Sequence, residues 1–229
     1  MTRVVLIGDS ITEGCGSSNA ELFSLAPNLQ RLLGDEYKVI NCGKSGATLM
    51  DTPSKRPVQY KTLDEYNKAK KEIKDADERG EKIIISIMLG TNDADVASYG
   101  FEVFGEEYYN KYKVAYFTEY INLIEELSSI TPDFKLIINL SPYSYDSVKH
   151  KNFGNLESIW KIQNTIYNTL YDKGFSVILN DLKTPTSKKV LKDEKTIEKF
   201  YSDWLHPSDV GYTYLSHFFY LAVKRAENI

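Results

Sequence analysis

The chain has 229 residues and a mass of 26.2 kDa, a size typical of one large α/β domain, and we expect a single domain over residues 1–229. It carries 28 lysine and arginine residues against 32 acidic residues, a net charge of −4, and this balance argues against a general nucleic-acid binder, which needs clustered positive charge. Aromatic residues make up 13% of the chain, which argues against disorder.

The N-terminal apolar run, Val4–Ile7, is too short for the core of a signal peptide, and no other apolar stretch approaches the length of a membrane span. We therefore expect a cytoplasmic protein. Cys15 and Cys42 fit neither a disulfide framework nor a metal-ligand pattern, and we expect both to be free thiols.

Five short apolar runs are spread along the chain, and each is followed directly by glycine or asparagine. None alternates with a period of two, which is typical of strands buried on both faces of a parallel sheet. The expected strands are Val4–Ile7, Tyr37–Ile40, Ile83–Leu89, Leu136–Ile138 and Phe175–Leu179.

Helical patterns separate these runs. The spacing of three and four residues predicts one apolar face on each helix. We expect Gly174 to cap one helix, Ser208 to start the last one, and residues 61–79 to form an exposed helix. The expected buried faces are Leu22, Leu25, Leu29 and Leu32; Val114, Phe117, Ile121, Ile124 and Leu127; Leu156, Ile159, Ile166 and Leu170; and Val210, Tyr214, Leu215, Phe218 and Leu221. The alternation of strand and helix predicts a three-layer α/β/α domain.

Polar clusters follow the first three strands, at the edge where open α/β sheets bind ligands. In Gly8–Gly14, Ser10 is a candidate nucleophile, although for this cluster alone a helix cap or a phosphate-binding loop is the more ordinary interpretation. In Asn41–Thr48, the glycines, Gly46 among them, can aim N–H groups into a crevice or simply form a turn. In Gly90–Asp93, Asn92 is either a neutral donor to an oxyanion or part of an Asx turn.

A fourth cluster contains Asp203 and His206, three residues apart, and Pro207 biases His206 away from helical geometry. A tight turn would let the carboxylate meet the imidazole, with Trp204 and Leu205 anchoring the turn in the core. The other histidines, His150 and His217, lack a nearby acid, and we interpret them as structural or solvated.

Together these clusters resemble the SGNH hydrolases, also called the GDSL esterase family. The matching segments, in chain order, are GDSITEG, the Gly46 of NCGKSGAT, GTND and DWLHP, and they span residues 8 to 206. The GDSL motif reads GDSI here, a variation that keeps the serine. The resemblance implies a flavodoxin-like sheet of five parallel strands in the order 2-1-3-4-5.

The resemblance also implies roles for individual residues. Ser10 would attack the acyl carbonyl, His206 would act as general base, and Asp203 would orient the imidazole. The backbone N–H groups of Ser10 and Gly46 and the side-chain amide of Asn92 would form the oxyanion hole. No metal or organic cofactor is implied, and the expected partner is a small acyl ester.

The segment from residue 95 to 113 is rich in tyrosine and phenylalanine, and it is either a wall of the site or a loop packed on its own small core. We expect the substrates to be short-chain acyl esters, and we rank O-acetylated carbohydrate first among them. The alternatives are a lysophospholipase or thioesterase on the same fold, an inactive SGNH domain that binds carbohydrate, and a non-catalytic flavodoxin-like binding module.

Overall fold

The structure is a computed structural model that describes residues 1–51, 58–144 and 156–229. The main sheet has five parallel strands in the order β2-β1-β5-β6-β7, and a small parallel pair, β3 and β4, lies apart from it. The order 2-1-3-4-5 expected for the main strands is therefore confirmed. The strands are β1 (Thr2–Gly8), β2 (Tyr37–Gly43), β3 (Ala47–Thr48), β4 (Val58–Gln59), β5 (Lys82–Met88), β6 (Lys135–Leu140) and β7 (Val177–Asp181).

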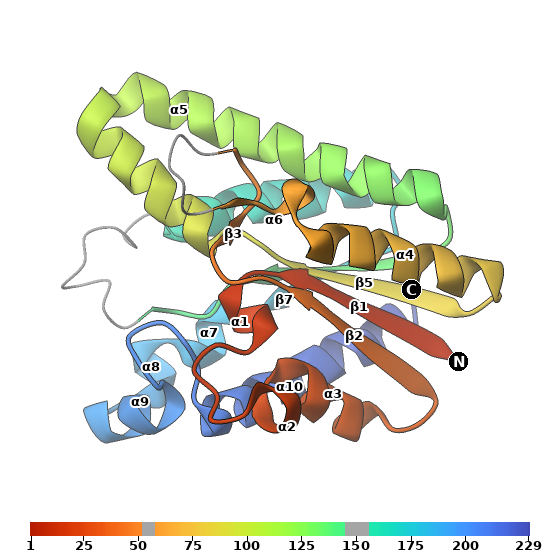
Figure 1. Cartoon of the computed structure of the whole chain (residues 1–229). Coiled ribbons are helices and arrows are strands. Elements are labelled where there is room, and N and C mark those ends of the chain that lie inside the picture. The colour runs from red at the N-terminus through yellow and green to blue at the C-terminus, as the bar shows by residue number, and fades with distance from the viewer. Residues whose placement is uncertain (52–57, 145–155) are drawn as a thin grey trace.

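Helices cover both faces of the main sheet and make three layers (Figure 1). One face is covered by α4 (Asp64–Glu78), α5 (Thr91–Ile130) and α6 (Leu156–Asp172), and the other by α3 (Leu25–Leu33) and α10 (Asp209–Ala226). Shorter helices connect them: α1 (Ser10–Glu13), α2 (Ala20–Phe23), the 3-10 turn η1 (Tyr60–Thr62), α7 (Lys183–Thr186), α8 (Lys188–Leu191) and α9 (Glu194–Phe200).

The strands carry two hydrophobic cores because their side chains alternate between the faces. In β1, Val5 and Ile7 face the core beneath α4 to α6, whereas Val4 and Leu6 face α3 and α10. All four side chains are buried, which explains why the run shows no period of two.

Several expected helix faces are wrong in detail. The leucine face of residues 22–32 falls on two helices that meet at Ser24, and only Leu25 and Leu29 are buried, while Leu22 and Leu32 are exposed. Val114, Val210 and Leu221 are also exposed.

The expected face of α5 is confirmed in part: Ile124 and Leu127 are buried, Phe117 and Ile121 are partly buried, and tyrosines take the place expected of Val114. Tyr116 and Tyr120 are fully buried, together with Leu123, Ile124 and Leu127. The hydroxyl of Tyr116 donates to the Leu89 carbonyl, so this buried phenol has a hydrogen-bond acceptor inside the core.

The helix expected over residues 61–79 is also less exposed than predicted. It begins at Asp64, and Tyr66, Ala69, Ile73 and Ala76 form a narrow buried stripe on the sheet. The expected face of α6 is confirmed, because Leu156, Ile159, Ile166 and Leu170 are all buried. Ser208 caps α10 through a bond from the Gly211 N–H, and Gly174 follows α6 with a φ of 84°.

The difference in burial between two leucines of α3 gives a stability prediction. Leu29 is 0% exposed and Leu32 is 37% exposed. We expect Leu29→Ala to lower the free energy of unfolding by about 2 to 5 kcal/mol, because it removes buried methyl groups and leaves a cavity. Leu32→Ala on the same helix should change stability by about 0.5 kcal/mol or less, as surface substitutions do. Denaturant unfolding of both variants checks this, and equal losses would contradict the assigned face.

Candidate active site

Ser10 lies directly after the C-terminal end of β1, at the first residue of α1. The preceding residue, Asp9, caps this helix, and its Oδ1 accepts from the Ile11 N–H at 3.0 Å. Ser10 is 4% exposed, and the adjacent strand end is held by a bond from the Lys44 N–H to the Gly8 carbonyl. The hydroxyl therefore sits on a rigid backbone, as a positioned nucleophile requires.

Asp203 shapes the turn that carries His206. Its Oδ1 accepts from the backbone N–H groups of Leu205 and His206, at 2.7 and 2.6 Å. Its Oδ2 lies 2.7 Å from Nδ1 of the His206 ring. One carboxylate thus fixes both the backbone of the turn and the orientation of the imidazole.

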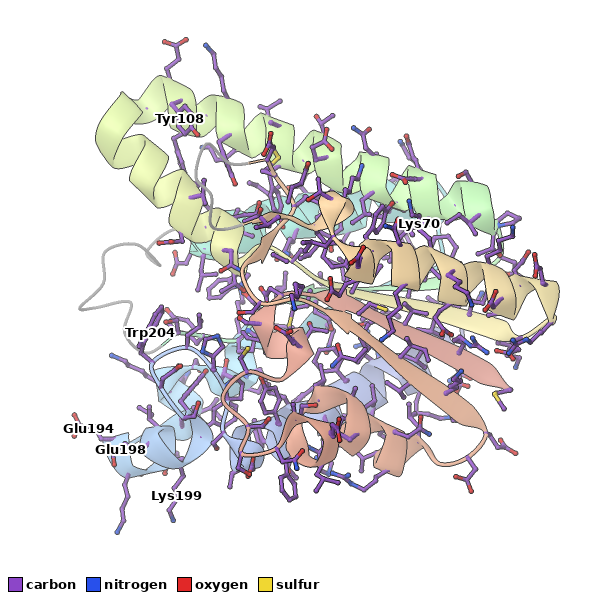
Figure 2. The ribbon with its side chains drawn as sticks, in the orientation of Figure 1. Lys70, Tyr108, Glu194, Glu198, Lys199 and Trp204 are labelled. Atoms are coloured by element: carbon purple, nitrogen blue, oxygen red, sulfur yellow. The ribbon has the colours of Figure 1, made fainter. Side chains whose placement is uncertain are left out.

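The flanking residues close this turn. The Ser202 N–H donates to the His206 carbonyl, and Tyr201 pairs with Pro207 as an isolated antiparallel bridge. Leu205 is buried, as expected of an anchor, but Trp204 is 37% exposed and projects outward (Figure 2). The expectation that Trp204 anchors the turn in the core is wrong.

Ser10, His206 and Asp203 form a continuous chain of contacts. Nε2 of His206 lies 2.9 Å from Oγ of Ser10, although the two residues are 196 positions apart in sequence. Of the other histidines, His217 is exposed on α10 with its Nδ1 beside the Thr213 carbonyl, and His150 lies outside the described residues.

Asp203 keeps its charge in this arrangement. Partial burial raises its pKa, but the backbone N–H and ring of His206 and the Leu205 N–H outweigh burial and lower the pKa below its ordinary value. The carboxyl group is therefore ionised at neutral pH and faces the imidazole as an anion.

Gly16 allows the loop after α1 to approach the turn of His206. Its φ is +91°, and a Cβ there would lie 2.7 Å from Cβ of His206 and 2.4 Å from Oγ of Ser202. Asp209 holds the same loop from the other side, because its two oxygens accept from the N–H and hydroxyl of Ser18 at 2.8 and 2.6 Å. The sequence patterns indicated no role for Gly16 or Asp209, and only their place next to the turn reveals one.

Gly46 and Asn92 both contact the short strand β3: Gly46 precedes it in the chain, and the Asn92 side chain bonds to its first residue, Ala47. Gly46 has a φ of +76°, and among the described residues no acceptor pairs with its N–H. The side-chain amide of Asn92, on the first turn of α5, donates one proton to the Ala47 carbonyl at 2.9 Å. An amide has two such protons, so the second remains for a ligand. The Asn92 side chain is thus bonded to the residue that follows Gly46, which brings the two expected oxyanion residues next to each other.

Two carboxylates to which the sequence motifs gave no role brace the segment around Gly46. Oε2 of Glu13 accepts from the Ser45 N–H at 2.6 Å, and its Oε1 pairs with Lys44 at 3.2 Å. On the far side, the carboxylate oxygens of Asp93 accept from the N–H groups of Leu49 and Met50 at 2.9 and 3.0 Å. The segment is thus held at both ends. Glu13 belongs to GDSITEG and Asp93 to GTND, so motif membership was the available signal.

Asp9 and Asp93 are both fully buried beside this edge of the sheet. Burial raises the pKa of Asp9 to about 6, against the Ile11 N–H and Thr91, which lower it. Burial likewise raises the pKa of Asp93 to about 6, against the Leu49 and Met50 N–H groups and the Tyr112 hydroxyl. Each acid therefore titrates near the lower end of the physiological range.

Both cysteines are free thiols, as expected, with Cys42 buried and Cys15 half-buried. Burial raises the pKa of Cys42 to about 12, so this thiol is an inert side chain. Within residues 1–51, 58–144 and 156–229, no group of three or more His, Cys, Asp or Glu side chains is placed to hold a metal ion. In the same part of the chain, no helix combines the length and hydropathy that a membrane crossing requires.

The aromatic segment at residues 95–113 is helical, so the loop, one of its two interpretations, is wrong. It forms the first part of α5, which bends at Gly105 before running back along the sheet (Figure 1). The side chains of residues 98–104 are not described, so the expectation that this segment forms a wall of the site is not tested for Tyr99, Phe101 and Phe104. Tyr112 is buried and its hydroxyl donates to Asp93 at 3.2 Å, whereas Tyr108 is only half-buried (Figure 2).

The profile of the GDSL-like lipase/acylhydrolase family matches residues 6–214, which cover the four clusters above. The chain belongs to this family. It is accordingly a GDSL-type ester hydrolase of the SGNH fold, as the sequence motifs predicted. A search of curated protein sequences found no match.

Solved structures confirm the fold. A lipase/acylhydrolase from Enterococcus faecalis has 24% identity and a TM-score of 0.61, with 98% of this chain and 96% of that chain covered. An aryl esterase from M. smegmatis has 14% identity and a TM-score of 0.64, with coverage of 99% and 100%. A family 3 carbohydrate esterase from Clostridium thermocellum has 18% identity and a TM-score of 0.62, with coverage of 100% and 98%.

The raised pKa of Asp9 gives a prediction on stability. Because the pKa is higher in the folded state than the usual 3.8, the unfolded chain binds fewer protons between pH 4 and 6, and stability falls as the pH rises through this window. An asparagine at this position would keep an acceptor for the Ile11 N–H without the buried charge. We expect Asp9→Asn to raise the free energy of unfolding at pH 7.5 by about 2 to 3 kcal/mol.

Urea unfolding of both proteins at pH 7.5 and pH 4 measures this difference. The gain should shrink toward zero at the lower pH, where the wild-type carboxyl is protonated. A variant that is less stable than wild type at pH 7.5 would show that the ionised carboxylate is a net stabilising group.

Proposed function

We propose that this ester hydrolase uses Ser10 as nucleophile, His206 as general base and Asp203 as the residue that orients the imidazole. The observation that carries the proposal is the contact chain of 2.9 Å from Ser10 to His206 and 2.7 Å from His206 to Asp203. A proton on Nδ1 directed at the ionised Asp203 leaves Nε2 free to accept the proton of the Ser10 hydroxyl.

The proposed reaction has two halves. Ser10 Oγ attacks the acyl carbonyl while Nε2 takes its proton, and the tetrahedral intermediate collapses as that proton passes to the leaving alcohol. Water then adds to the acyl-enzyme with His206 again as base, which releases the acid and restores Ser10. No metal or cofactor takes part in this scheme.

We propose that the oxyanion is held by the N–H groups of Ser10 and Gly46 and by the free amide proton of Asn92. Each such donor is typically worth about 10² to 10³ in turnover. Support comes from the braces on this segment: Glu13 and Asp93 fix it, so the donors need no reorganisation when charge develops.

We propose short-chain esters of carbohydrate as the substrate class. The segment that follows Asn92 is rich in tyrosine and has no aliphatic stripe that would receive a fatty chain. One of these tyrosines, Tyr112, donates a hydrogen bond to Asp93. Est24, a structure similar in fold at 14% identity and a TM-score of 0.60, is described as a carbohydrate acetylesterase.

A long-chain acyl substrate is the second candidate, and one observation favours it. An apolar groove of about 730 Å³ lies between α2 and α10 and is lined by Phe23, Val210, Tyr214 and Phe218 among others. None of the proposed catalytic or oxyanion residues lines this groove, which is why we rank the short-chain class first. A flavodoxin-like binding module would leave the pairing of Asp203 with His206 without a purpose.

The nucleophile is tested by Ser10→Ala. We expect turnover of p-nitrophenyl acetate to fall by at least about 10³-fold with folding unchanged, because only the attacking oxygen is lost. Cys15→Ser, which changes the nearby thiol, should keep wild-type turnover. Steady-state kinetics and circular dichroism measure both effects. An active, folded Ser10→Ala protein would overturn the proposal. An acyl group trapped on Cys15 would identify that thiol as the nucleophile instead.

The acyl preference is tested with acetyl, butyryl, octanoyl and palmitoyl esters of one alcohol. We expect kcat/KM to be highest for acetyl or butyryl esters and to fall steeply beyond about eight carbons. An open groove would instead add about 0.8 kcal/mol of binding for each buried methylene. A steady rise through palmitoyl would favour the lysophospholipase or thioesterase alternative.

A further inference from the structure

A second pocket, lined by both aromatic and polar side chains, lies at the end of β6, between α6 and the segment that holds α7. Its volume is about 360 Å³, within the usual range for a small-molecule site. It is lined by Tyr143, Glu157, Trp160, Lys161, Asn164, Lys183, Thr184 and Ser187. None of the residues proposed for catalysis belongs to it.

The wall of this pocket is tied to the turn that carries His206. The Tyr201 hydroxyl donates to the carbonyl of Tyr143, and the Ser144 hydroxyl donates to the carbonyl of Trp204 at 3.2 Å. Ser10 follows β1 and Tyr143 follows β6, which stand two strands apart in the sheet. Two strand spacings are roughly 10 Å, so one oligosaccharide can reach from the pocket to Ser10.

Two lysines of the pocket have no carboxylate partner among the residues that the structure describes. The Lys183 ammonium lies 5.5 Å from the centre of the Trp160 ring, and within the described residues neither Lys183 nor Lys161 forms an ion pair. By contrast, Lys44 forms ion pairs with Glu13 and Glu65.

The remaining lining suits a sugar ring. The indole N–H of Trp160 is already used, since it donates to Oγ of Ser141 at 3.1 Å, and Tyr143 packs beside the indole at 5.5 Å. The half-buried Tyr143 and the buried Trp160 thus form the aromatic part of the lining. Around them, Asn164 donates to the Trp160 carbonyl, Thr184 to Asp181 and Ser187 to the Thr184 carbonyl. Their side-chain oxygens and the second amide proton of Asn164 are left to bond sugar hydroxyls.

We propose that this pocket binds a negatively charged sugar unit, one that bears a carboxylate or a phosphate, within the acylated carbohydrate substrate. Lys161 and Lys183 pair with the anionic group, and the polar side chains receive the ring hydroxyls. The inference rests on the proposed carbohydrate esterase function. Glu157 is exposed and lies one helical turn before Lys161 in the lining. Its negative charge repels the anionic group, so the affinity is lower than the two lysines alone would give.

Binding is tested by calorimetry on the full chain with three matched monosaccharides: methyl glucuronide, glucose 6-phosphate and methyl glucoside. We expect at least one anionic sugar to bind about 10-fold or more tightly than the neutral glucoside. The double variant K161Q/K183Q should lose this preference, and Glu157→Gln should strengthen it. The control K71Q/K74Q makes the same change of charge on the exposed lysines of α4, which pair with Asp75 and Glu78, and should match wild type.

The tighter of the two anionic sugars identifies the charged group as a carboxylate or a phosphate. Equal binding of all three sugars, no binding of either anionic sugar, or a preference that survives K161Q/K183Q would overturn the inference.

A kinetic test separates this inference from the proposed function. We expect K161Q/K183Q to lower the ratio of kcat/KM for an acetylated acidic oligosaccharide to that for an acetylated neutral one by about 10-fold. Hydrolysis of p-nitrophenyl acetate that depends on Ser10, together with an unchanged ratio, would overturn the pocket alone. Hydrolysis that survives Ser10→Ala would overturn the proposed function, whatever the sugar binding shows.

Discussion

The carboxylate of Asp203 is the contact on which the geometry of the site depends. One of its oxygens accepts from two consecutive backbone N–H groups and the other faces the ring of His206, so backbone and imidazole are set by one group. The turn can meet Ser10 because parallel strands end at the same edge of the sheet and α10 starts next to it. A rotation of this one side chain would release both the turn and the ring.

Acidic side chains perform the same task throughout this edge. Glu13 and Asp93 hold the segment that contains Gly46, and Asp209 holds the loop that contains Gly16, each by accepting from N–H or O–H groups. Loops have many backbone donors without partners, and a short carboxylate satisfies two or three of them at once. The cost is the burial of charge, which is visible in the raised pKa of Asp93. The loops around Ser10 are therefore rigid without a large hydrophobic core of their own.

Much of the architecture could be predicted because it follows from local patterns. The five apolar runs became the five main strands, and four motifs in chain order indicated the fold and the residues at its edge. Helix faces were less predictable. Leu22 and Val210 fit a helical period yet are exposed, while Tyr116 and Tyr120 are buried. A period states which residues share a face, but tyrosine suits either side, so only packing decides which face is inward.

The sequence by itself determined the fold class and the candidates Ser10, Asn92, Asp203 and His206, because strands and motifs are encoded by neighbouring residues. The strand order came from the resemblance of those motifs to the SGNH hydrolases. Only the tertiary structure decided that Ser10 and His206 lie 2.9 Å apart, that Gly16 faces the turn and that Glu13 and Asp93 brace one segment. It also decided that residues 95–113 are helical and that Lys161 and Lys183 share a pocket with Trp160. These relations join positions far apart in sequence, and they depend on how helices pack across the sheet, which no local pattern records.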